Sequence, residues 1–391
     1  MELLKEAKQL IKQNIREYGM YIALVFIMII FSITTGGLFT SSRNISNLIN
    51  QNGYIAVLTV GMTLVLIICN IDLSVGYAAG FLGAVAAILL TQYNLPVFVV
   101  VPLVLILGII IGLCNGILVG KVKIPAFVVT LAGMMIFRGA LLLITEGTGT
   151  IIIPNKTFNA IGNGFIPDIV KGSDIHILTL IIGGLAILFY IWSQFKTRKN
   201  NIKYNFKVVS MKMFILKVTF ISIIIAYLTW ILANYNGLSW TTVVVAIVVA
   251  IYHFITNKTQ LGRHIYAVGG NIEAAKLSGI NVNKITYIVF ASMGMLAALA
   301  GILYTARLQS ATTVAGTGFE MDAIAAAYVG GVSAAGGVGK ITGSIIGALV
   351  IASMTNGMNL MGVGIHYQYI IKGLVLVVAV AFDIQTRKKR K

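Results

Sequence analysis

Few side chains in this chain are suited to catalysis or metal binding, because it holds four histidines, two cysteines and eleven acidic residues among its 391 residues. The histidines are scattered: His176, His253, His264 and His366. No HExxH pattern and no His/Cys cluster at ligand spacing occurs. Both cysteines, Cys69 and Cys114, fall in apolar stretches and predict packing residues. We therefore expect no metal site, no cofactor and no catalytic residue.

One glycine-rich stretch, "AAGGVGKITGS" at 334–344, resembles a phosphate-binding loop at first sight. The GxxxxGK[ST] pattern requires glycine at position 334 and Ser or Thr at 341, because backbone N–H groups and that hydroxyl hold the phosphates and Mg²⁺. The chain has Ala334 and Ile341 instead. The stretch therefore predicts a turn between helices and no nucleotide site.

Three ionisable residues stand inside apolar blocks: Asp72, Arg138 and Lys372. A charge at the centre of a bilayer costs roughly 2.5 to 3.5 kcal/mol on insertion scales, so each needs a partner, a wet cavity or an interfacial depth. Asp72 lies in a short polar break, "NIDLSVG", and is the only acid that we expect inside a span. A purely structural role is the alternative to a functional one, since Asp72 or Ser74 can cap a helix that begins near Val75.

The elements that carry these residues are membrane spans, because 58% of the chain is hydrophobic, 10% is charged and the mean hydropathy is +0.94. We predict an all-α polytopic membrane protein of 10–12 transmembrane helices. The expected spans lie near 20–39, 53–70, 75–91, 96–118, 125–144, 176–195, 218–235, 239–256, 285–305, 340–359 and 367–384. The Gly/Ala-rich segment 322–337 is short, which favours a broken helix shielded by protein.

The charge distribution predicts the orientation of these spans. Of the 29 Lys and Arg residues, 23 fall in segments that can all lie on one side of the membrane. The positive-inside rule assigns that side to the cytoplasm, so the net charge of +18 requires no nucleic-acid partner. Both termini then face the cytoplasm: residues 1–19 as an amphipathic helix and residues 385–391 as a basic tail.

A weak internal repeat runs through the chain. Gly112 is followed 26 residues later by Arg138, and Gly347 is followed 25 residues later by Lys372. The predicted threading inverts the second copy relative to the first, and inverted repeats with broken helices are common in alternating-access transporters. Chance similarity between glycine-rich apolar segments is the alternative. Glycines at 108, 112, 116 and 120 share one helix face and predict close helix packing.

The polar loop at 257–284 contains a predicted short helix at 272–278. Asn271 is a suitable N-cap, Glu273 favours the first turn, and Gly279 provides the left-handed stop. Gly269 and Gly270 predict a turn before it. A capped helix tied to two adjacent spans is a rigid element that another protein can push, whereas an amphipathic turn lying on headgroups is the alternative.

Several stretches resemble one family, the membrane permeases of bacterial ABC importers for monosaccharides of the ribose, xylose and arabinose group. They are "GRHIYAVGGNIEAAKLSGI", "NIDLSVG", "KIPAFVVTLAGMMIFRG" and "AAYVGGVSAAGGVGKITGSIIGALVI", in the expected order. The resemblance covers nearly the whole chain, 1–391, as a single permease domain. A basic and apolar insert at 196–240 makes the chain most similar to the D-xylose permeases.

The resemblance implies a permease homodimer in the bacterial inner membrane, without enzymatic activity of its own. It implies a cytoplasmic ATPase with two nucleotide-binding domains, and a periplasmic or lipid-anchored binding protein that delivers a monosaccharide. We expect the loop at 257–284 to contact the ATPase, with Ala274 and Ala275 permitting close docking and Leu277 filling a pocket. The expected coupling residues are Gly269, Gly270, Asn271, Glu273, Ala274, Ala275, Leu277 and Gly279.

A neutral sugar released by its binding protein requires modestly polar pathway walls. The candidates are Asn70, Asp72, Ser74, Tyr77, Asn115, Tyr328 and Asn356. Each is also a plausible packing or capping residue. The external segment Thr145–Asp174 is expected to receive the binding protein, or else to cover the bundle passively. An ion-coupled secondary transporter of a small polar solute is the alternative function, supported by Asp72 alone.

Overall fold

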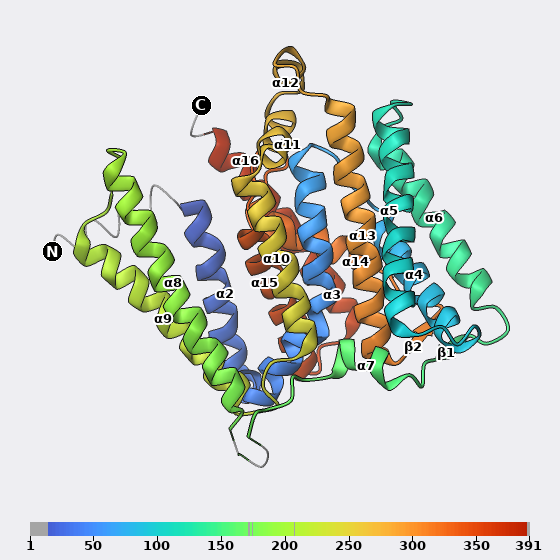
Figure 1. Ribbon diagram of the computed structural model, residues 1–391, viewed down its shortest axis with the longest axis horizontal. Helices are drawn as coiled ribbons and strands as arrows, with labels where there is room; N and C mark the ends of the chain where they lie inside the picture. The colour runs from blue at the N-terminus through green and yellow to red at the C-terminus, as the bar shows by residue number, and fades with distance from the viewer. Residues whose placement is uncertain (1–14, 171–172, 174, 207, 389–391) are drawn as a thin grey trace.

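A computed structural model describes residues 15–170, 173, 175–206 and 208–388, which form a helical bundle (Figure 1). Nine of the described helices are long and apolar enough to cross a membrane, and Gly19–Thr34 and Val75–Thr91 are shorter apolar helices. A further helix, α14, has 11 residues. The prediction of an all-α polytopic membrane protein is confirmed.

The first half of the chain contains α2 (Ile15–Thr34), η1 (Leu38–Thr40), α3 (Ser42–Ile67), α4 (Val75–Thr91), α5 (Val97–Gly120), α6 (Ala126–Ile144), β1 (Thr150–Ile152) and α7 (Lys156–Asn163). Next come α8 (Ile177–Lys203), α9 (Met211–Ala233), α10 (Trp240–Lys258), α11 (Gln260–Gly270) and α12 (Ile272–Leu277). The last elements are α13 (Val282–Leu308), β2 (Ser310–Thr312), α14 (Phe319–Val329), α15 (Ile341–Leu360) and α16 (Ile365–Lys388). We call the two ends of the bundle the α12 end and the β end, after α12 and the β1–β2 pair.

Two four-helix units, α3–α6 and α13–α16, can be distinguished in the bundle. Helix α3 ends at the α12 end, where α13 begins, so these two helices run in opposite directions and pack against each other (Figure 1). In the first unit α4 packs against α6, and in the second α14 packs against α16. The arrangement agrees with the predicted inverted repeat, because corresponding helices occur in the same order and with corresponding neighbours.

Glycines let the two units approach closely. Gly108 of α5 faces the carbonyl of Gly294 in α13, and Gly112 faces the carbonyl of Phe290, with no room for a Cβ at either glycine. Gly116 and Gly120 continue this face against Tyr287. The predicted glycine face is therefore confirmed, and backbone contact takes the place of side-chain packing along α5 and α13.

The half-length α14 begins beside the start of α4. Gly76 in the first turn of α4 lies directly against Gly316 and Glu320. With 11 residues α14 spans about 16 Å, roughly half the hydrocarbon thickness. A glycine-rich loop then returns the chain at the α12 end, where Gly337 N–H donates to the Ile67 carbonyl at 2.8 Å. The predicted broken helix is confirmed.

The limits of several spans differ from the predictions. The first span ends at Thr34 instead of 39, because Gly36 and Gly37 adopt positive φ and stop the helix. The same helix begins at Ile15, inside the segment expected to be a separate amphipathic helix; residues 1–14 lie outside the described residues. The second span begins at Ser42 instead of 53, since Ser41 caps it by accepting from Asn44 N–H.

The insert at 196–240 extends α8 and supplies α9, which packs against α8 as a hairpin at the periphery of the bundle (Figure 1). Lys196 lies over the Trp192 ring at 4.7 Å, and Arg198 lies over the Phe214 ring at 4.9 Å. At the other end of the chain, α16 continues to Lys388 and includes the first residues expected in the basic tail; residues 389–391 lie outside the described residues.

Candidate functional site

Helix α12 projects from its end of the bundle as a short, capped element (Figure 1). The Asn271 side chain accepts from Ala274 N–H at 3.0 Å and satisfies one of the free donors of the first turn. Gly279 ends the helix with φ of 79°. Lys276 donates to Glu273 at 2.8 Å on its exposed face. The predicted capped helix is thus confirmed at both ends.

Two expectations about this segment are wrong. Gly269 and Gly270 form no turn, because they are the last residues of α11. Gly269 lies against the Ile67 carbonyl, so its lack of a side chain allows α11 to reach the end of α3. Ala275 is only 3% exposed and belongs to the core of the chain itself, so it anchors α12 and cannot dock to a partner.

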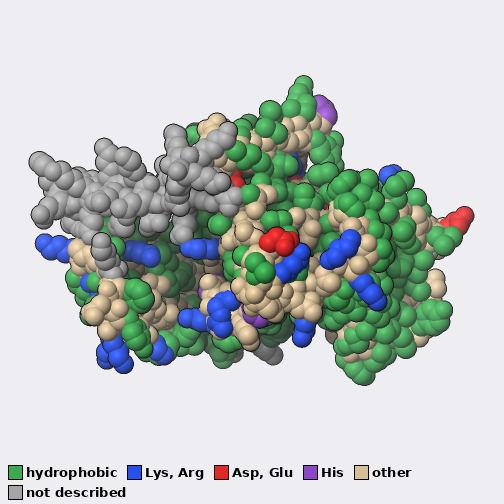
Figure 2. All heavy atoms as spheres, turned by 90° about the horizontal axis from the view of Figure 1, so that it is seen from above, with side chains coloured by type: hydrophobic (Ala, Val, Ile, Leu, Met, Phe, Trp, Pro, Cys, Tyr) green, Lys and Arg blue, Asp and Glu red, His purple; other side chains and the backbone are tan. Residues whose placement is uncertain are grey.

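The surface that α12 offers is dominated by Leu277, which is 90% exposed. Ala274 and Glu273 are exposed beside it. Figure 2 views the molecule from the α12 end and shows many Lys and Arg side chains, with few acidic ones, on this face. A large apolar side chain that protrudes beyond a basic surface has no partner within the described residues, and it is available to a pocket on another protein.

Three predicted pathway residues form one connected network. Ser74 Oγ donates to Asp72 Oδ1 at 2.6 Å, and Asn115 Nδ2 donates to Ser74 Oγ at 3.2 Å. The Ser74 backbone N–H also donates to Asp72, at 3.0 Å. Asn115 lines a groove of about 420 Å³ between α5 and α6. The network joins α4 to α5, and all three side chains are buried.

The other pathway candidates lie apart from this network. Tyr77 has its hydroxyl 3.4 Å from Thr317 Oγ1. Asn356 exchanges hydrogen bonds of 2.8 and 3.1 Å with Asn44, linking α15 to the start of α3. Asn70 follows α3 and Tyr328 lies near the end of α14, both half-buried. No described contact joins Asn356 to the Asp72 network.

The two cations singled out from the sequence have different surroundings. Lys372 of α16 donates to both carboxylate oxygens of Asp322 in α14, at 2.9 and 3.0 Å. Arg138 of α6 is exposed and lies over the Tyr77 ring of α4, 5.7 Å from its centroid. No ion pair to Arg138 occurs within the residues that the structure describes.

Glu320 is a buried acid that the sequence analysis missed, so the expectation that Asp72 is the only acid within a span is wrong. The Glu320 side chain is 5% exposed, and its Oε2 has no hydrogen-bond partner among the described residues. The predicted span at 322–337 began too late to include it. The glycines at 316 and 318, with φ of 89° and 76°, were the signal for the helix start.

The described residues 145–170 form a cover at the β end. Strand β1 pairs antiparallel with β2, with Ile151 opposite Ala311. Helix α7 is held against the end of α13, where Asn163 Nδ2 donates to the Ala306 carbonyl at 2.8 Å and Arg307 donates to Asn163 Oδ1 at 2.8 Å. This part of the surface is thus fixed to the second unit.

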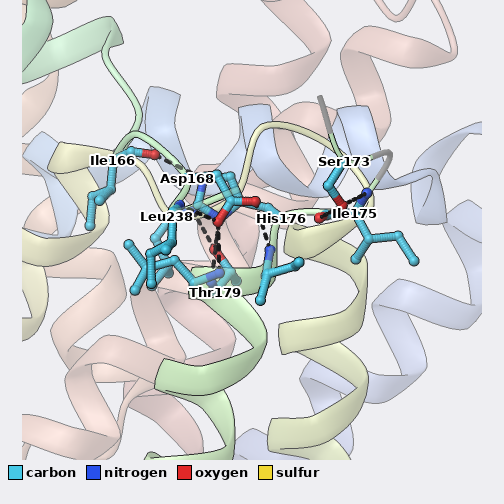
Figure 3. Close-up of polar contacts among 10 residues, drawn as sticks. Ile166, Asp168, Ser173, Ile175, His176, Thr179 and Leu238 are labelled. Atoms are coloured by element: carbon cyan, nitrogen blue, oxygen red, sulfur yellow. Dashed lines mark hydrogen bonds and ion pairs between the residues drawn. The ribbon is translucent and has the colours of Figure 1, made fainter. Parts of the chain in front are cut away.

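Asp168 and His176 organise the start of α8 (Figure 3). Asp168 accepts from the N–H groups of Ile177 and Leu178 at 2.8 and 2.9 Å. Burial raises the pKa of Asp168. The two backbone hydrogen bonds just described, a third from Ile169 N–H and the neighbouring His176 all lower it. Their combined effect is larger, so the pKa of Asp168 lies below its usual value. His176 Nε2 donates to the Ile166 carbonyl at 2.9 Å, since a carbonyl can only accept.

Comparison with known proteins gives a consistent result. Residues 44–380 match the family described as "Branched-chain amino acid transport system / permease component". The xylose transport system permease protein of Haemophilus influenzae is 41% identical over 96% of this chain and 98% of its own length, and that of Escherichia coli K12 is 37% identical over 96% and 93%. The ribose import permease protein of Haemophilus influenzae is 35% identical over 94% and 93%. No solved structure matches.

The match spans most of the chain and includes both four-helix units, α12 and the insert. A permease component provides the membrane path of a transport system and is not an enzyme. The chain therefore belongs to the family of transport-system permease components, and its bundle of apolar helices places it in a membrane.

Proposed function

We propose that this chain is the permease subunit of an ABC importer that carries a monosaccharide, D-xylose in the first instance, across a bacterial inner membrane. The observation that carries the proposal is the 41% identity, over nearly the full length of both chains, to a xylose permease. The ribose permease is less similar at 35%. A separate ATPase supplies the energy and a sugar-binding protein delivers the cargo.

Helix α12 supports the coupling role. Asn271 and Gly279 fix its two ends, Ala275 anchors it to the core, and Leu277 remains exposed for a groove of the ATPase. Because α12 is joined to α13 by only four residues, 278–281, a displacement of α12 acts directly on the second unit. Each permease chain has one α12, so an ATPase with two nucleotide-binding domains is matched by a permease homodimer.

The orientation follows from charge. The Lys and Arg side chains at the α12 end favour a cytoplasmic location for this face, and for both termini with it (Figure 2). The opposite β end then faces the binding protein, with the segment 145–174 as its proposed docking surface. The Asp72–Ser74–Asn115 network, together with Asn70, Tyr77, Tyr328 and Asn356, contributes the polar groups of the sugar pathway.

Uptake by the complete complex tests the function. The permease, its ATPase and its binding protein are placed in vesicles, and uptake of labelled xylose, ribose and galactose is measured with and without ATP. We expect ATP-dependent uptake that is fastest for xylose. Uptake that persists without ATP and stops when an ionophore removes the ion gradients would establish the secondary-transporter alternative instead.

A pair of variants at one position tests the coupling role. Leu277→Glu places a charge in the proposed apolar contact, so we expect sugar-stimulated ATP hydrolysis to fall at least tenfold while insertion and thermal stability stay unchanged. Leu277→Met keeps an apolar side chain of similar volume and serves as the matched control. Equal ATP hydrolysis in both variants contradicts docking through α12.

A further inference from the structure

Arg138 carries a charge well inside the apolar length of α6. It lies six residues before the last residue, Ile144, about 9 Å from that end of the helix. Its side chain is exposed, and it has neither a hydrogen bond nor an ion pair within the described residues. Ionisable groups at such depth almost always face a protein interior or a water-filled path, because the hydrocarbon gives them no compensation.

The second unit contains a cation that has a carboxylate partner. Lys372 of α16, which the weak sequence repeat matches to Arg138, contacts Asp322, the fourth residue of α14, at 2.9 Å. Arg138 instead contacts Tyr77, the third residue of α4. Within the described residues, Arg138 thus has only an aromatic ring as its partner, whereas its counterpart in the repeat has a carboxylate. All N–H donors of the Arg138 guanidinium therefore remain unused there.

The contact that Arg138 makes leaves its polar edge free. Tyr77 holds the guanidinium through its ring and directs its own hydroxyl to Thr317. The N–H groups of Arg138 can therefore donate to the hydroxyl oxygens of a neutral sugar.

We propose that Arg138, held by the Tyr77 ring, binds the transported monosaccharide by donating from its planar guanidinium to two adjacent hydroxyl oxygens. This inference rests on the proposed sugar-import function and assigns it a specificity-determining residue. The site lies beside the start of α4, where Tyr77 contacts Thr317 just before α14. The loss of one sugar hydroxyl leaves part of the guanidinium unpaired and slows transport of that analogue.

The test compares uptake of D-xylose with uptake of deoxy analogues that each lack one hydroxyl. The complete complex is used, with the same binding protein throughout, so its own selectivity cancels between variants. We expect the wild-type complex to favour xylose over one analogue, and Arg138→Leu to reduce that preference about tenfold. Arg43→Leu changes an exposed arginine at the start of α3 and should leave both uptake rates unchanged.

Arg138→Lys keeps the charge and removes the planar fork, so it should also lose the preference, even if Arg138→Leu fails to fold. An equal slowing of all sugars, or an unchanged preference in the lysine variant, overturns the proposal and leaves Arg138 as a structural or headgroup-contacting residue. Failure of the wild-type complex to transport any monosaccharide would instead refute the proposed function, so the two failures are distinguishable.

Discussion

The two units of the bundle differ in what surrounds a cation inside an apolar helix. Between α14 and α16, Lys372 and Asp322 form a largely buried ion pair, with side-chain exposures of 19% and 24%. Between α4 and α6, Arg138 has only the face of Tyr77. One unit uses the charge to hold two helices together, whereas the other leaves its donors available.

This difference separates a structural role from the proposed binding role within one architecture. An ion pair that is mostly removed from water ties its helices firmly, because removal of either partner leaves an uncompensated charge. A cation–π contact is weaker, about 0.5 to 2 kcal/mol, and leaves the edge of the guanidinium free. We therefore expect substitutions in the second unit to affect stability and substitutions in the first unit to affect transport.

Loss of Lys372 should produce the largest change in stability. Lys372→Met leaves Asp322 unpaired in α14, and we expect a destabilisation of about 2 to 3 kcal/mol, reduced by the partial exposure of the pair. Thermal unfolding of the purified protein measures it. The double variant Lys372→Met/Asp322→Leu removes both charges and should recover most of the loss. Equal stability of Lys372→Met and wild type contradicts the structural role.

A carboxylate at position 77 should make the first unit resemble the second. Tyr77→Glu offers Arg138 a partner near the position that Asp322 occupies in α14, so the guanidinium is no longer free for sugar. We expect sugar uptake to fall about tenfold, which corresponds to about 1.4 kcal/mol. Tyr77→Gln has the same size without the charge and should slow uptake less. Similar uptake in the two variants argues against a charge effect.

Two acids on α14 should respond to neutralisation with opposite signs. Asp322→Asn breaks the pair with Lys372 and lowers thermal stability. Glu320→Gln removes a buried charge whose Oε2 has no partner, so we expect stability to rise by about 1 kcal/mol. Unfolding temperatures at neutral pH compare the two variants directly. A loss of stability in Glu320→Gln would show that its second oxygen is needed where it lies.

The smallest effect is expected outside both units, at Asp168. Its folded-state pKa is lowered, so the stabilisation is present above the unfolded value of about 3.9 and is lost as the pH falls through the folded value. Asp168→Asn should therefore differ from wild type in stability at pH 7 and converge with it at the most acidic pH. A constant difference over the whole pH range contradicts this linkage.

Local signals in the sequence predicted some elements correctly. The Asn271 cap and the Gly279 stop each act within one helical turn, so α12 could be placed from its own residues. The broken helix at α14 followed from the short length of its apolar run. The glycine face of α5 followed from spacing alone, because four residues return to the same side of a helix.

Features that depend on distant residues could not be predicted. Ala275 and Ala274 are neighbours of the same type, yet the core packed beneath α12 buries only Ala275. Gly269 resembled a turn residue because its close contact, Ile67, lies about 200 positions away in the chain. Asn356 pairs with Asn44, which lies 312 positions away in the chain, so sequence alone left it among the pathway candidates.

The glycine contacts between α5 and α13 determine how a movement of one helix is transmitted to the other. Where Gly108 and Gly294 meet, the two backbones touch and no flexible side chain lies between them to absorb a shift. Helices α5 and α13 must then turn as one rigid body, although they come from different units. A displacement that starts at α12 and moves α13 therefore reaches Asn115 of α5 through direct backbone contact.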